Sequence, residues 1–141
     1  MIRTLLTLTA GIGIGFGGLG AARHGEKSSV KPFAVSNIVE KLDGKDAKVT
    51  FVEVILEPAQ AGAPHRHPGP VFGYVLEGEY EWAVDDRPAK VLKTGETFYE
   101  PTGSLHRVSK NPAAKGMTRV LAVVLHPRDA KELAVPEAKK H

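Results

Sequence analysis

Short runs of apolar and β-branched residues follow one another along the chain from residue 48 onward, and turn-forming residues separate them. Runs of this length and composition are typical of β-strands rather than helices. Between two of the runs, the glycine-containing segment Glu77–Glu79 indicates a tight hairpin turn. The predicted strands are Lys48–Leu56, Val71–Leu76, Tyr80–Val84, Val91–Leu92, Thr97–Glu100, Leu105–Ser109 and Thr118–Leu125.

Two of these predicted strands have a pattern that is typical of burial on both faces. Lys48–Leu56 carries β-branched or aromatic residues on each side, interrupted by Glu53, and Thr118–Leu125 is a continuous β-branched and apolar run. Nearer the C-terminus, Asp129 as an N-cap predicts one short helical turn over Ala130–Leu133. The whole pattern predicts an all-β fold, an antiparallel sandwich or barrel with at most one short helix.

The N-terminal segment Met1–Ala22 has a different pattern. Arg3 is its only charged residue, and the apolar, glycine-rich run that follows ends in small residues at Gly20 and Ala22. This is the pattern of a secretory signal peptide, which predicts a periplasmic or secreted protein. An uncleaved membrane anchor is the alternative, because the uncharged run approaches the roughly 20 residues that span a bilayer.

The remainder of the chain divides into three segments. Residues 23–47 are expected to hold a leader and a first strand, and the part from 23 to 31 lacks apolar periodicity and is expected to be disordered. Residues 48–126 hold the predicted barrel, and residues 127–141 form a C-terminal tail.

Composition and charge narrow the choice of partners. The chain has 141 residues, a formal net charge of +3, 42% apolar residues and no cysteine. This length allows one domain, and the lack of cysteine excludes a disulfide framework, a thiolate metal site and a cysteine nucleophile. Basic residues are scattered among acidic ones, so we expect no nucleic-acid partner, and no stable membrane association once the signal is cleaved.

One pair of side chains indicates metal chemistry. His65 and His67 flank Arg66, and on a strand residues at i and i+2 leave the same face about 6–7 Å apart. Two imidazoles can therefore converge on one metal ion while Arg66 points away. A barrel would allow His106, in another predicted strand, to lie opposite the pair. Two surface or turn histidines are the alternative interpretation of the pair alone.

The surroundings of this pair resemble the first motif of the cupin family. His65, His67 and Gly78 match the histidine pair and the glycine of that motif. The motif also has a glycine six residues before the first histidine, where this chain has Ala59, and a glutamate four or five residues after the second. Val71 and Phe72 occupy those two places, and no carboxylate occurs between His67 and Glu77, so the glutamate is missing.

The second cupin motif matches more fully. Gly95, Pro101, Gly103 and His106 stand at every expected spacing, while the usual asparagine after the histidine is displaced to Asn111. The resemblance extends roughly from residue 51 to residue 125. It implies a single jelly-roll β-barrel of the kind found in small, single-domain cupins, with the histidines pointing into its cavity.

The resemblance also implies one divalent metal ion per chain. In this family the ion is held by two histidines of the first motif, one of the second and the glutamate, so the implied site here consists of three neutral imidazoles from His65, His67 and His106. Such a site suits Fe(II) or Zn(II) best, with Ni(II), Cu(II) and Mn(II) as further candidates. A cupin that has lost its metal is the alternative. Glu53 or Glu100 replaces the missing carboxylate only if its strand face points inward.

Four residues are expected to shape a substrate pocket: Val71, Tyr80, Trp82 and Tyr99. Tyr80 and Trp82 alternate with Val84 on one predicted strand, and by analogy with the family that face lines the barrel. Core packing is the alternative role of these side chains. Tyr99 is expected to donate a phenolic hydrogen bond to a metal-bound ligand.

The resemblance leaves the function open, because cupins include dioxygenases, isomerases, lyases and plain binding proteins. Our main hypothesis is an exported metal-binding cupin that acts on or binds a small oxygen-rich organic molecule as an Fe(II)-dependent dioxygenase, with no catalytic residue beyond the metal ligands. The alternatives are a non-catalytic periplasmic module that binds or senses a small molecule or metal, and a structural domain. We also expect a homodimer that buries outward residues of Phe51–Ile55 and Val71–Leu76.

Overall fold

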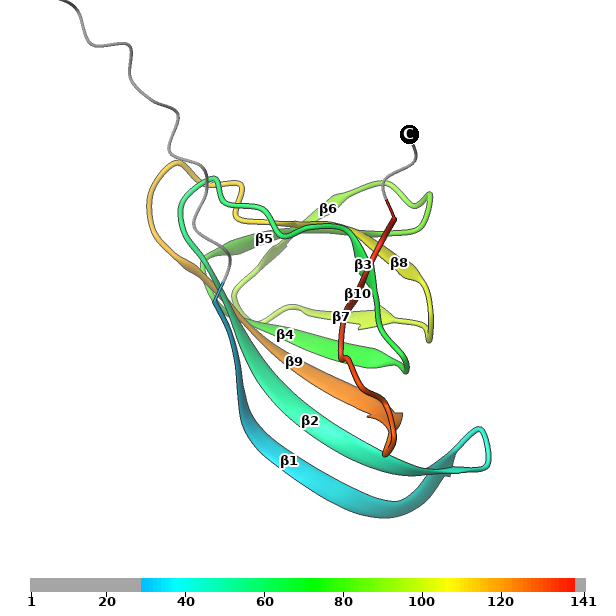
Figure 1. Cartoon of the computed structure of the whole chain (residues 1–141). Helices are drawn as coiled ribbons and strands as arrows, with labels where there is room; N and C mark the ends of the chain where they lie inside the picture. The colour runs from blue at the N-terminus through cyan, green and yellow to red at the C-terminus, as the bar shows by residue number, and fades with distance from the viewer. Residues whose placement is uncertain (1–28, 139–141) are drawn as a thin grey trace, which may run out of the picture.

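The computed structural model describes residues 29–138, which form two antiparallel five-stranded sheets that face each other (Figure 1). The order in the first sheet is β1 (Ser29–Leu42), β2 (Lys45–Leu56), β9 (Thr118–Pro127), β4 (Val71–Glu77) and β7 (Thr97–Glu100). The order in the second is β10 (Val135–Pro136), β3 (His65–Arg66), β8 (Leu105–Lys110), β5 (Glu79–Val84) and β6 (Lys90–Lys93). The predicted all-β jelly-roll barrel is thereby confirmed.

The strands extend beyond the expected barrel at both ends. β1 begins at Ser29, so the last residues of the expected disordered leader pair with the edge of β2, which they cover. At the other end, β10 belongs to the expected tail and pairs with β3. The predicted signal segment Met1–Ala22 and the rest of the leader lie outside the described residues.

The predicted helical turn over Ala130–Leu133 is wrong, and the described residues contain no helix at all. A single turn is marginal in water, and here residues 130–134 form bends and irregular backbone that leads into β10, while the carbonyl of Leu133 accepts a hydrogen bond from His67. Residues 130–137 run along the barrel to β10, where Glu137 forms an ion pair with Arg66. We call these residues the C-terminal strap. Among residues 29–138 there is accordingly no apolar helix of membrane-spanning length.

The core lies between the two sheets and consists of their inward side chains. Its fully buried or nearly buried apolar residues are Val52, Leu56, Val71, Val75, Tyr80, Trp82, Val84, Phe98, Val120, Ala122 and Val124. Alternation along β4 and β9 sends every second residue inward, which is the period that a pleated strand imposes.

Gly73 fixes the position of one core ring. A Cβ atom at Gly73 would lie 2.0 Å from Cζ of Phe98 on the neighbouring strand β7, so the ring of Phe98 lies directly against the backbone of β4. From there Phe98 contacts the rings of Tyr80 and Trp82, with centroids 5.5 Å and 5.4 Å away. The glycine therefore lets an aromatic ring fill the space between the sheets.

The outer face of the first sheet is also apolar. Tyr99, Phe72, Val123 and Phe51 lie opposite one another in register across β7, β4, β9 and β2. Phe72 is 53% exposed, and its ring packs on Tyr99 at a centroid distance of 5.3 Å. This row explains why β2 and β9 are apolar on both faces, since one face lines the core and the other belongs to the outer surface.

Candidate metal centre

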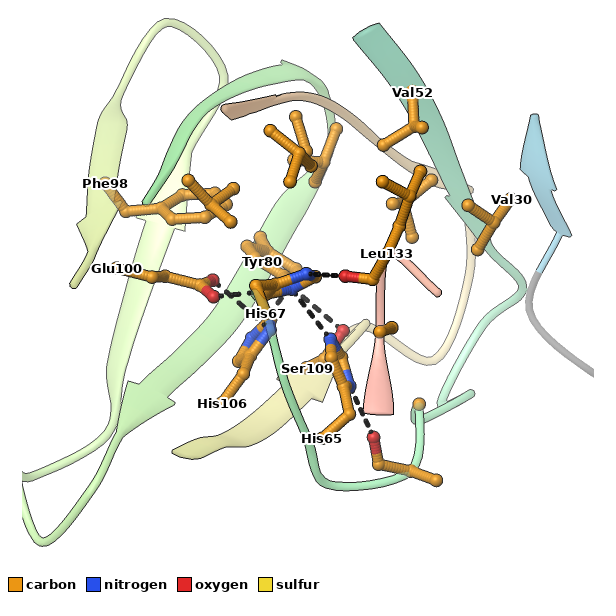
Figure 2. Close-up of a pocket in the computed structure, with 18 residues that line it drawn as sticks. Val30, Val52, His65, His67, Tyr80, Phe98, Glu100, His106, Ser109 and Leu133 are labelled. Atoms are coloured by element: carbon orange, nitrogen blue, oxygen red, sulfur yellow. Dashed lines mark hydrogen bonds and ion pairs between the residues drawn. The ribbon is translucent and has the colours of Figure 1, made fainter. Parts of the chain in front are cut away.

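A cavity of about 210 Å³ lies inside the barrel between the two sheets. Most of its wall is apolar, and its polar groups gather at one end, where the histidines, Glu100 and Tyr80 meet (Figure 2). The apolar wall includes Val52, Val71, Phe98, Val120, Val124 and Leu133. The cavity thus combines a hydrophobic chamber with one cluster of groups able to hold an ion or a polar atom.

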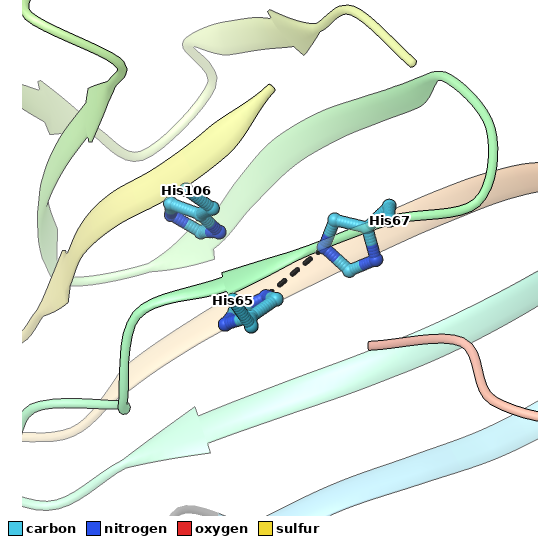
Figure 3. A group of neighbouring side chains, drawn as sticks. All are labelled: His65, His67 and His106. Atoms are coloured by element: carbon cyan, nitrogen blue, oxygen red, sulfur yellow. Dashed lines mark hydrogen bonds between the residues drawn. The ribbon is translucent and has the colours of Figure 1, made fainter. Parts of the chain in front are cut away.

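The strand register brings the three predicted histidines together. His65 on β3 lies directly opposite His106 on β8, and His67 follows two residues after His65. One ring nitrogen from each lies within 4.8 Å of the others (Figure 3). The ring of His65 has centroid distances of 4.7 Å to His67 and 4.9 Å to His106. Two sequence motifs about 40 residues apart thus form one group that can hold a metal ion.

Backbone carbonyls fix the tautomers of the first two histidines. His65 Nδ1 donates to the carbonyl of Ala63 at 2.8 Å, and His67 Nδ1 donates to that of Leu133 at 2.5 Å. Burial lowers the pKa of His67 to about 4, so its ring is neutral at neutral pH and carries a lone pair on Nε2. The two Nε2 atoms are 3.0 Å apart. With both Nδ1 atoms protonated, the two Nε2 lone pairs face each other and repel unless a proton or a metal ion lies between them. Carbonyl acceptors behind metal-bound imidazoles are a common arrangement.

His106 presents its other nitrogen to the cluster. Tyr80 donates its hydroxyl proton to Ser109 at 2.9 Å, so its oxygen accepts from Nε2 of His106 at 3.2 Å. The lone pair of His106 is then on Nδ1, which is buried and has no hydrogen-bond partner. Burial, with the nearby His65 and His67, lowers the pKa of His106 to about 3. All these features fit a divalent cation, which binds neutral imidazole lone pairs.

Glu100 is the site residue that the sequence interpretation underrated. It is 1% exposed and points into the cavity from β7, directly opposite Val71 on β4. Its Oε1 accepts from Trp82 Nε1 at 3.1 Å and lies 3.2 Å from His106 Nδ1. Its Oε2 lies 3.6 Å from His67 Nε2. Burial raises the pKa of Glu100 to about 7.

Of the other residues expected at the site, some line the cavity and others lie outside it. Val71 and Tyr80 line it, whereas Trp82 is a buried core residue whose contact with the site is its hydrogen bond to Glu100. Tyr99 lies outside the cavity, since the residue is 49% exposed on the outer face of the first sheet. Glu53 is also excluded as a ligand, since it forms an ion pair with Arg119 on the same outer face.

Fold and site together define a small β-barrel protein with an internal histidine cluster able to hold a metal ion. A family model described as "Cupin domain" matches residues 52–124, and the chain therefore belongs to the cupin family. No curated protein matches the chain by sequence.

Solved structures with the same fold include three that cover most of this chain. An uncharacterised conserved protein with a double-stranded β-helix domain from Klebsiella pneumoniae is 20% identical, with a TM-score of 0.59 over 79% of this chain and 86% of that one. The TT1209 protein of Thermus thermophilus is 26% identical, with a TM-score of 0.54 over 76% and 90%. An oxalate oxidase in complex with the substrate analogue glycolate is 20% identical, with a TM-score of 0.57 over 78% and 56%.

Proposed function

We propose that this protein is a metal-binding cupin that holds one divalent ion through His65, His67 and His106. The observation that carries the proposal is the 3.0 Å approach of two Nε2 lone pairs whose rings are both oriented by backbone carbonyls. Fe(II) and Zn(II) suit such imidazole ligands best, and Ni(II), Cu(II) and Mn(II) are further candidates.

The shape and lining of the cavity support a small organic ligand. Its volume of about 210 Å³ is below the roughly 300–1,000 Å³ of pockets for drug-sized molecules. No lysine or arginine is among the residues that line it, so it offers no cation to pair with a carboxylate remote from the metal. Among small oxygen-rich molecules, we therefore expect one that places its oxygen donors at the metal and an apolar body against Val71, Val120 and Leu133.

A bound divalent ion would supply Lewis acidity or, as Fe(II), reactivity toward dioxygen. The residues around it perform the other tasks. Tyr80 and Ser109 keep His106 in one tautomer, the carbonyl of Leu133 orients His67, and the apolar wall excludes water. An Fe(II)-dependent dioxygenase is the catalytic form of this proposal. A non-catalytic module that binds or senses a small molecule or metal is the alternative.

We further propose that the protein works in the periplasm or outside the cell. This rests on the signal-like pattern of Met1–Ala22, which lies outside the described residues.

The test of metal binding is calorimetry with Fe(II) and Zn(II) on protein carrying a tag without histidine, compared with His106→Ala. Loss of one of three imidazoles should weaken both metals at least about 100-fold, beyond the usual effect of a residue behind a ligand. The matched control is His126→Ala, which also removes a buried imidazole but one that lies outside the cavity and contacts Thr50. Equal binding by His106→Ala and wild type would refute the site.

Oxygen uptake by the Fe(II)-loaded protein separates the two forms of the proposal. Catechols, diketones and flavonols are suitable probes, because each offers oxygen donors at one side of an apolar body. Uptake that His106→Ala abolishes would establish the enzyme. Full metal occupancy without uptake for any probe would favour the binding module.

A further inference from the structure

The cavity contains a carboxylate in a place where the first cupin motif does not put one. The motif glutamate belongs at Val71, and in the β4–β7 ladder Val71 lies directly opposite Glu100. Residues opposite each other in an antiparallel pair share a face, with Cβ atoms about 4.5–5.5 Å apart. The side chain of Glu100 therefore starts one strand away from the missing glutamate and points to the same side of the sheet.

The contacts of Glu100 leave one of its oxygens free for a further bond. Oε1 accepts the indole proton of Trp82, whereas Oε2 is buried and has no hydrogen-bond partner. Figure 2 shows the carboxylate turned toward His67 and His106, to which it approaches within 3.6 Å and 3.2 Å. Because Trp82 holds the first oxygen, the second remains directed at the histidine cluster.

Among the described residues, buried side-chain polar atoms without a hydrogen-bond partner occur at this one place. Two buried side-chain atoms there lack a hydrogen-bond partner, Oε2 of Glu100 and Nδ1 of His106. Most buried polar groups in folded proteins are hydrogen-bonded, so two unpaired atoms on neighbouring side chains require an explanation. Both are electron-pair donors, which a cation would satisfy together.

The charge around the site leads to the same conclusion. An ionised carboxylate in an apolar cavity is unfavourable unless a cation compensates it. No lysine or arginine is among the residues that line this cavity, so no side chain of permanent positive charge lies there to compensate the carboxylate. A divalent metal ion is the partner that this arrangement lacks.

We infer that Glu100 is the carboxylate ligand of the metal centre, supplied from β7 in place of the motif glutamate that Val71 replaces. The inference rests on the proposed function and adds a carboxylate to the proposed ligands of the metal ion. The ligand set becomes three imidazoles and one carboxylate, and the formal charge of the filled site falls from +2 to +1. Oxygen-preferring Mn(II) then becomes a competitive occupant, whereas a centre of three imidazoles alone disfavours it.

The test is calorimetry of Mn(II) and Zn(II) binding to the full chain, compared with Glu100→Gln, which keeps the hydrogen bond to Trp82 but removes the charge. Mn(II) affinity should fall about 100-fold or more and Zn(II) affinity by less, so that the Mn(II)-to-Zn(II) ratio drops. Glu79→Gln, an exposed substitution on β5, is the control and should leave both affinities unchanged.

A rescue variant separates a ligand from a residue that only orients a histidine. Adding Val71→Glu to Glu100→Gln returns a carboxylate to the same face one strand away and should restore Mn(II) affinity to within about tenfold of wild type. A residue that only positions His106 would weaken both metals equally, and position 71 would not restore them. Thermal unfolding of the metal-free variants verifies folding, and Glu100→Asp, with intermediate Mn(II) affinity, serves if Glu100→Gln does not fold.

The two proposals fail in different ways. If wild type and Glu100→Gln bind Mn(II) and Zn(II) equally well, Glu100 is not a ligand and the histidine site stands. If wild type binds neither metal, the metal centre itself is refuted, and the assignment of Glu100 with it.

Discussion

Glu100→Gln should stabilise the metal-free protein, and the gain should depend on pH. Burial raises the pKa of Glu100 in the folded protein from 4.5 to about 7. Between these values the folded state binds more protons at this side chain than the unfolded chain does. The contribution of the protonated carboxyl to stability is therefore complete below pH 4.5 and is lost as the pH rises through 7.

The size of the effect follows from that difference in pKa. Each pH unit between the two values is worth about 1.4 kcal/mol, so ionised Glu100 costs about 3 kcal/mol at pH 8 and less than about 1 kcal/mol at pH 5. Glutamine has no charge to bury. The gain in unfolding free energy from the substitution should therefore be about 2–3 kcal/mol larger at pH 8 than at pH 5.

Urea denaturation at both pH values, in the presence of a chelator, measures this gain. The fluorescence of Trp82, the one tryptophan of the chain, reports unfolding because the indole is buried in the core. His67 and His106 titrate in both proteins, so their contributions cancel in the difference between variant and wild type. A gain that is the same at pH 5 and pH 8, or a variant less stable at pH 8, would refute the description of Glu100 as an uncompensated buried carboxylate.

Three further predictions concern the fold, the assembly and the N-terminus. Gly73→Ala should cost at least about 2 kcal/mol of unfolding free energy in urea titrations, because its Cβ would overlap Phe98, and a cost near zero would show that the strands can separate. Phe72→Glu should convert the expected homodimer to a monomer in analytical ultracentrifugation. Val91→Glu, a substitution at a similarly exposed position on the other sheet, should leave the dimer intact. A monomeric wild type at micromolar concentration would contradict the prediction. Intact mass spectrometry of protein from its native host should find a chain that starts near Arg23, and a soluble full-length chain would argue against export.

The fold was predictable because glycines mark the turns between the strands that carry the histidines. Gly78, Gly95 and Gly103 all adopt positive φ angles, of 75°, 92° and 72°, which glycine tolerates better than other residues. Their spacing, with the strands between them, determines where His106 lies relative to His65. The three histidines of the candidate site followed from this spacing and from a resemblance that the structure confirms.

The fourth member of the cluster, Glu100, was named only as a conditional ligand, because the other face of its strand was expected to point inward. Neighbouring residues on a strand point to opposite sides, so placing Tyr99 in the pocket necessarily placed Glu100 outside it. In Thr97–Glu100 both faces carry an aromatic residue, and the sequence alone contains no signal that decides between them. Only the pairing of β7 with β4, which positions Phe98 against Gly73, shows which face is buried.

The C-terminal strap joins one part of the cavity wall to the tautomer of one histidine. Leu133 forms part of the cavity wall, and its carbonyl also holds the proton of His67 on Nδ1. The ion pair between Glu137 and Arg66 anchors the strap to β3. Displacement of this segment would therefore remove part of the cavity wall and, in the same movement, free His67 to exchange its tautomer. A fragment that ends with β9 at Pro127 would retain all three imidazoles. It would lose the carbonyl of Leu133, which keeps the proton of His67 on Nδ1 and the lone pair on Nε2.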